Sequence, residues 1–107
     1  DDVRVTVETR GSSGETPLHW MAILGDANGV RVLCEAGADL NALDNLGNAP
    51  IHEAISNLQV LALIVLLECG ADISVRNRMQ QTPLELAQAL CHQPAIDVLV
   101  SASGVRG

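Results

Sequence analysis

Short apolar segments alternate with polar turn residues along this chain, and the apolar segments come in pairs. Thr16 and Thr82 each stand directly before a proline, which is the order of an N-cap hydroxyl and the first helical residue. Gly37 and Gly70 stand where a left-handed residue would end a helix. The pattern therefore predicts six short helices, at 17–25 and 27–36, at 50–57 and 60–69, and at 83–91 and 95–102.

Two motifs recur with one period. The sequence TPLH at 16–19 returns as APIH at 49–52 and as TPLE at 82–85, and 33 residues separate the prolines at 17, 50 and 83. The sequence GAD at 37–39 returns at 70–72 with the same offset. Two independent motifs that share a period indicate an internal repeat, in which each unit is one helix–turn–helix.

Repeats of 33 residues with TPLH and GAD resemble ankyrin repeats, and the resemblance covers about 12–104. It implies an all-α, short solenoid in which each repeat has two antiparallel helices and a projecting loop. Neighbouring loops would pair as β-hairpins, with tips near 12–13, 45–46 and 78–79. We expect repeats at 12–44, 45–77 and 78–107, the last of them cap-like. Val3, Val5 and Val7 alternate with polar residues, so we expect residues 1–11 to be an N-terminal extension or a short strand.

Four positions depart from the family pattern. Ala49 replaces the capping threonine of the second repeat, at an expected cost of about 1 kcal/mol. Glu85 replaces the histidine of the third repeat. Leu58 and Gln80 stand where the pattern has glycine. We expect these departures to alter local geometry without changing the fold.

The helix expected over 60–69 is apolar on nearly every side. Such a helix must be covered by neighbours in nearly all directions, as the middle one of three would be. Its apolar run, 60–67, is too short to cross a bilayer, which takes about 20 residues.

The charge balance limits the class of partner that fits this chain, and the cysteine usage indicates a cellular compartment. The chain has 13 acidic and 6 basic residues and a formal net charge of −7, which argues against nucleic acid and membrane surfaces and favours a basic protein partner. Cys34, Cys69 and Cys91 form no CxxC pair and stand among apolar residues, so we expect buried, reduced thiols and a cytoplasmic protein. The first residues are acidic and polar and show no secretory signal.

The residues with reactive side chains do not form a recognisable reaction centre. The family resemblance implies that His19 and His52 are structural, each ring bonding the nearby threonine hydroxyl or backbone. Cys91 and His92 are adjacent but lack the spacing of a zinc site, and no glycine-rich phosphate motif is present. We expect no catalytic residue, no metal and no cofactor, and hence no enzyme. Trp20, the sole aromatic residue, is expected mainly to pack the first helices, with one edge reachable.

Ankyrin repeats bind partners through their loop tips and the exposed side of their first helices, which together form a concave face. The matching candidates in this sequence are Ser13, Glu15, Ile23 and Leu24, then Asn45, Leu46, Asn48 and Asn57, and finally Arg78, Met79, Gln81 and Leu90. Five of these are apolar at positions that should face water, and they predict a patch larger than a monomer normally exposes. Glu15 and Arg78 would form its polar rim.

The sequence favours a non-catalytic protein-binding module over two other classes. One version is a small inhibitor or immunity-type protein, and another is the ankyrin segment of a larger regulatory or host-directed protein. A self-associating structural subunit, as a weak homodimer, is the second class. An enzyme is the third, and neither a cleft nor an activated residue supports it.

Overall fold

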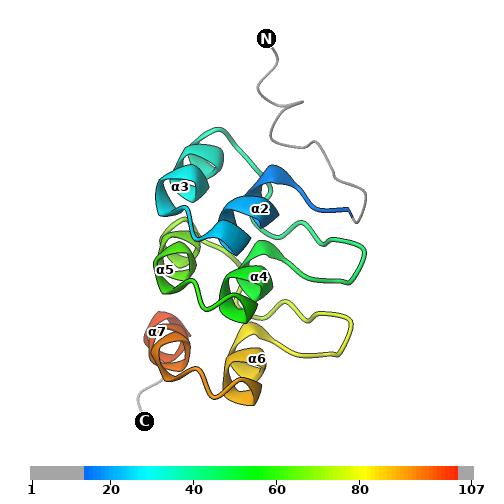
Figure 1. Ribbon diagram of the computed structural model, residues 1–107, viewed down its shortest axis with the longest axis vertical. Coiled ribbons are helices and arrows are strands. Elements are labelled where there is room, and N and C mark those ends of the chain that lie inside the picture. Colours follow the sequence, from blue (N-terminus) through cyan, green and yellow to red (C-terminus); the bar gives the residue numbers. More distant parts are fainter. Residues whose placement is uncertain (1–13, 104–107) are drawn as a thin grey trace.

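Three pairs of helices stack side by side in the computed structural model, which describes residues 14–103 (Figure 1). The first helices form one layer, the second helices form the other, and the loops project from the side of the first layer (Figure 1). The bounds are α2 Pro17–Leu24, α3 Ala27–Glu35, α4 Pro50–Ser56, α5 Val60–Glu68, α6 Pro83–Ala89 and α7 Gln93–Ser103. The all-α repeat architecture is confirmed, while the extension at 1–11 lies outside the described residues.

The projecting loops are turns, and residues 14–103 contain no strand, so the expected β-hairpins are not formed in this part. In the loop of the second repeat, the Asp44 N–H donates to the Asn48 carbonyl and the Gly47 N–H to the Asp44 carbonyl, both at 3.0 Å. The Asp44 carboxylate also accepts the N–H groups of Leu46 and Asn48 at 2.9 Å. The aspartate thus occupies donors that a strand ladder would use, which is why the loop closes as an Asx-type turn.

The three first helices begin at proline but are capped differently. Thr16 Oγ1 accepts the His19 N–H at 3.3 Å, and Thr82 Oγ1 accepts the Glu85 N–H at 3.2 Å. Glu85 completes the third cap, because its carboxylate accepts the Thr82 N–H at 2.9 Å. Ala49 has no side-chain acceptor, so α4 lacks the hydroxyl half of its cap.

Non-glycine residues adopt left-handed backbone angles at positions where other repeats have glycine. Leu58 has φ 59° and Cys91 has φ 54°, at the place where the first repeat has Gly25 with φ 75°. Gln80 has φ 64°, at the place of Gly47 with φ 77°. The fold dictates this conformation at the ends of the first helices and in the loops, and the side chains there strain the backbone.

The core lies between the two layers and is aliphatic. The largest of its fully buried apolar side chains are Leu18, Ile51, Ile55, Leu63, Leu66 and Leu99. Small residues such as Ala22, Ala54 and Ala87, each fully buried, let neighbouring elements approach closely. The sole tryptophan, Trp20, is 46% exposed, and the chain has no Phe or Tyr, so no ring of these three kinds is fully buried in the core.

Two expectations about burial were wrong. Leu61 on α5 is 69% exposed, because α5 packs against α3, α4 and α7 and its remaining side faces outward. Cys91 is exposed, since it stands in the left-handed turn after α6, whereas Cys34 and Cys69 are half-buried. Within residues 14–103, no helix is both long enough and apolar enough to cross a membrane.

Restoring the missing cap should stabilise the protein. We expect Ala49→Thr to raise the free energy of unfolding by about 1 kcal/mol, because the new hydroxyl can accept the His52 N–H as Thr16 does for His19. Urea denaturation measures the change. Thr16→Ala is the matched control and should lower stability by a similar amount. A loss on Ala49→Thr would mean that the buried site has no room for the larger side chain.

Relieving one left-handed residue should also stabilise the fold. We expect Leu58→Gly to gain about 1 kcal/mol, because the leucine is strained at φ 59° and its side chain is 60% exposed. Asn57→Gly, next to it at φ −100°, is the control and should destabilise. Thermal unfolding of both variants measures the contrast, and equal losses would contradict the strain at Leu58.

Candidate functional site

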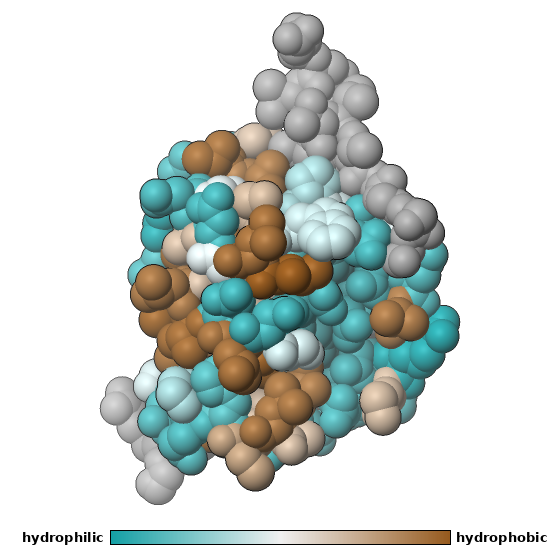
Figure 2. Space-filling model, in the orientation of Figure 1, coloured by the Kyte–Doolittle hydropathy of each residue, from teal (hydrophilic) through white to brown (hydrophobic). Residues whose placement is uncertain are grey.

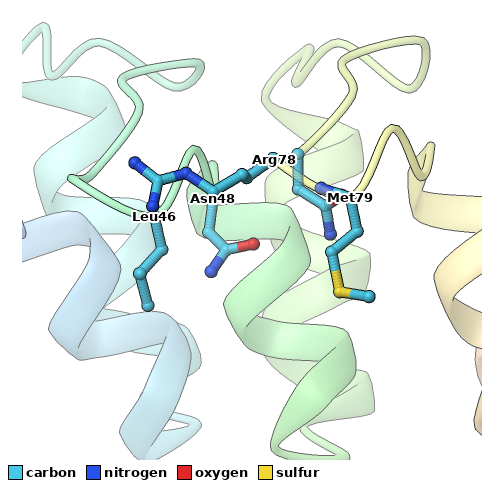
Figure 3. Close-up of a pocket in the computed structure, with 5 residues that line it drawn as sticks. Leu46, Asn48, Arg78 and Met79 are labelled. Carbon is cyan, nitrogen blue, oxygen red and sulfur yellow. The ribbon is translucent and has the colours of Figure 1, made fainter.

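A shallow pocket lies between the loops of the second and third repeats. Its volume is about 280 Å³, and it is lined by Leu46, Asn48, Asn77, Arg78 and Met79 (Figure 3). Leu46 is 58% exposed and Met79 is 77% exposed. Their side chains extend from neighbouring loops on either side of Asn48 (Figure 3). Two flexible apolar groups therefore flank a small depression with a polar amide at its centre.

The two apolar side chains are held by equivalent turns in successive repeats. The buried Asn77 uses its side-chain oxygen to accept the N–H groups of Met79 at 2.9 Å and Gln81 at 3.0 Å. Asp44 does the same for Leu46, one repeat earlier. Leu46 and Met79 thus each stand two residues after an Asx-type turn residue. The turn fixes the backbone of Leu46 and of Met79, while their side chains stay exposed.

Arg78 joins the two loop tips. Its Nη2 donates a hydrogen bond to the Asn45 carbonyl at 2.9 Å. Close approach of the loops is possible because Gly47 has no Cβ, which would meet the Arg78 nitrogen at 2.9 Å. The sequence predicts Arg78 at the polar rim but does not predict its hydrogen bond to Asn45. The two residues are one repeat apart in the sequence, and only the stacking of the loops brings them together.

Buried histidines hold the loop that follows each of the first two repeats. Nδ1 of His19 accepts the Thr16 N–H at 3.1 Å, so the ring proton lies on Nε2, which donates to the Asn48 carbonyl at 2.8 Å. His52 repeats the arrangement, with its Nε2 at 3.0 Å from the Gln81 carbonyl. The expected structural role of these histidines is seen. Their hydrogen bonds also reach the next repeat, where the accepting carbonyls belong to Asn48 and Gln81, two of the candidate site residues.

The other candidates do not line the pocket. Ile23, Leu24, Asn57 and Leu90 stand at the far ends of the first helices, which are about 10–12 Å long. Leu24 is 66% and Leu90 is 45% exposed. Figure 2 shows hydrophobic side chains gathered over the helices, while the loop side is mostly hydrophilic with isolated apolar projections. The predicted single patch is thus two surfaces, and Ser13 lies outside the described residues.

Three carboxylates lie near one another where the first and second repeats meet. Glu53, half-buried on α4, has a pKa raised by burial first and then by the negative charges of Asp44 and Glu15. Mutual repulsion of this kind is relieved when a cation approaches. The carboxylates therefore make this part of the loop side attractive to a basic group.

Trp20 is a residue whose exposure the sequence reasoning underrated. It occupies in α2 the position that Glu53 occupies in α4, and its ring is 46% exposed. Packing was expected to dominate, with only one edge reachable. The composition of the chain could have predicted this exposure. The core is aliphatic, so the single tryptophan is not needed to fill it and is available for contact with a partner.

Comparison with known proteins decides the family. A family model described as ankyrin repeats (3 copies) matches residues 2–77. The chain belongs to the ankyrin-repeat family. The Notch protein of Drosophila melanogaster is 33% identical over 96 residues, which are 88% of this chain and 4% of that protein. Rabankyrin-5 of Mus musculus is 34% identical over 94 residues, 87% of this chain and 8% of that protein.

The chain thus spans less than a tenth of these relatives. Ankyrin repeats are protein–protein interaction modules and are typically non-catalytic. Within residues 14–103 of this ankyrin-repeat chain, no group of three or more His, Cys, Asp or Glu side chains could hold a metal ion.

Acidic pH should destabilise the protein through His52, whose ring is hydrogen-bonded to the following loop. Burial lowers the pKa of His52 below its ordinary 6.5, so the unfolded chain binds a proton more readily than the folded one. Stability from this group is present above pH 6.5 and is lost as the pH falls below it. We expect the urea midpoint to drop between pH 7.5 and pH 5.5, and to drop less in His52→Gln, which cannot titrate. An equal drop in both proteins would exclude His52 as the cause.

Proposed function

We propose that this ankyrin-repeat chain is a non-catalytic module that binds a protein partner through its loop tips. The observation that supports this most is the pair Leu46 and Met79, which are 58% and 77% exposed around one pocket on turns that fix their backbones. Because the backbone of both residues is already held by the turns, binding has to order only their side chains, and such apolar side chains can serve as anchors. Trp20 and the candidates at the helix ends extend the contact along the concave face.

The proposed partner is a basic protein. The net charge of −7 attracts cations, and the carboxylates of Glu15, Asp44 and Glu53 lie beside the loop side. Two arginines are already paired, Arg31 with Glu68 at 2.7 Å and Arg76 with Glu85 at 3.1 Å. Complementary charge of this kind raises the rate of encounter and helps select the partner.

Two versions of this function differ in their setting. The first is a small cytoplasmic inhibitor or immunity-type protein that blocks its target. The second is the ankyrin segment of a larger regulatory or host-directed protein, and it is favoured by relatives of which the matched region is 4% to 8%. The length of the gene product in cells of the source organism separates the two versions.

Capture with matched variants tests the site. We expect tagged wild type to retain a basic protein from lysate of the source cells, and the double variant Leu46→Asp, Met79→Asp to lose at least tenfold in affinity for it, because each aspartate adds charge at an apolar anchor. Leu61→Asp is the control, since Leu61 is 69% exposed on the outer helix α5. It should bind as wild type does. Circular dichroism verifies that all three proteins are folded.

Two outcomes would overturn this proposal. A folded double variant that binds as tightly as wild type would exclude the loop-tip site, and Leu24→Asp would then test the helix ends. A chain that retains no partner and elutes with the mass of a dimer in light scattering would support the self-associating alternative instead.

A further inference from the structure

Cys34 and Cys69 meet on the helical side of the molecule, in the layer of second helices. Cys34 lies in the last turn of α3, and Cys69 is the residue that ends α5 in the next repeat. The two helices pack against each other, and Cys69 is near enough to Cys34 to help raise the pKa of its thiol. Both side chains are half-buried, so they are held in place and remain reachable by small molecules.

A neighbouring ion pair links the two helices at this point. Arg31 stands one turn before Cys34 on α3, and its Nη2 lies 2.7 Å from the Glu68 carboxylate, next to Cys69. The positive charge of Arg31 is also close enough to interact with Cys69. The ion pair thus joins α3 to the end of α5 beside both cysteines.

We propose that Cys34 and Cys69 are an oxidisable thiol pair that closes to a disulfide between the first and second repeats. The pair is a modification site that is independent of the proposed partner-binding function. Its oxidant is a hydroperoxide or a small-molecule disulfide. The bond would join α3 to α5 on the helical side and leave the loop tips free.

The chemistry assigns a different part to each sulfur. Burial and the nearby Cys69 raise the pKa of Cys34 to about 12, so Cys34 keeps its proton at neutral pH. Cys69 is therefore the sulfur that attacks hydrogen peroxide and becomes a sulfenic acid, with release of water. The Cys34 sulfur then attacks the sulfenic sulfur, the Cys34 proton and the sulfenic hydroxyl leave as water, and the S–S bond forms. In sum, two thiols are oxidised to a disulfide and one peroxide is reduced to two waters.

A bond at this place should stabilise the repeat stack. It would close a loop from 34 to 69, and constraint of a loop this long in the unfolded chain raises Tm by roughly 15 °C. Because adjacent repeats hold each other only through their shared interface, the gain applies to the contact between the first two repeats.

The test uses the Cys91→Ser protein, because exposed Cys91 would otherwise react on its own. The protein is treated with hydrogen peroxide or oxidised glutathione at neutral pH in the absence of denaturant. We expect a mass loss of about 2 Da, a proteolytic fragment that joins 34 to 69, a rise in Tm, and reversal of all three by dithiothreitol.

Cys69→Ser is the matched control, since it keeps two cysteines, Cys34 and Cys91, that are not in contact. It should form no internal link and should carry glutathione at Cys91. In the wild-type protein, the extent of reaction at exposed Cys91 measures how much oxidant the protein has received. If Cys91 has reacted fully while Cys34 and Cys69 still alkylate as free thiols, the proposal is wrong. A link that forms only in urea, or glutathione on both cysteines of the Cys91→Ser protein, would overturn it equally.

Discussion

A buried imidazole ring bridges each of the first two repeats to the loop that follows. His19 and His52 each accept a backbone N–H at Nδ1 and donate from Nε2 to a carbonyl 29 residues further along the chain. Both rings are fully buried, so a lost bond would leave an unsatisfied polar group without water. Stacking, loop position and candidate site all depend on this link.

The same link explains two departures from the repeat pattern. Glu85 stands at the histidine position of the third repeat, where its carboxylate caps its own helix and pairs with Arg76. Ala49, in contrast, removes only the hydroxyl of the cap, and the His52 bridge stays intact. The bridge is therefore formed in both repeats that have the histidine.

In the candidate site, hydrogen bonds hold the backbone of the loops, while apolar side chains at the loop tips stay exposed. Turn residues Asp44 and Asn77 hold the backbone of the loops, and Arg78 ties one loop to the next across 2.9 Å. Leu46 and Met79 stay largely exposed in this arrangement, and their exposure is a cost that folding alone does not explain. The oxidisable pair at Cys34 and Cys69 lies on the helical side, so modification and partner binding can occur on separate surfaces.

The sequence by itself determined the repeat period, the six helices and the aliphatic core, because the prolines recur in every repeat, the threonine caps and the GAD motif recur in two of the three, and all of them act locally. It also named Leu46, Asn48, Arg78 and Met79, which share a surface by repetition. Tertiary structure alone decided which candidates meet, that Leu61 and Cys91 are exposed, and that the loops close as turns. Those outcomes depend on side-chain contacts between repeats, and the spacing of residues along a chain does not encode the distances across a stack.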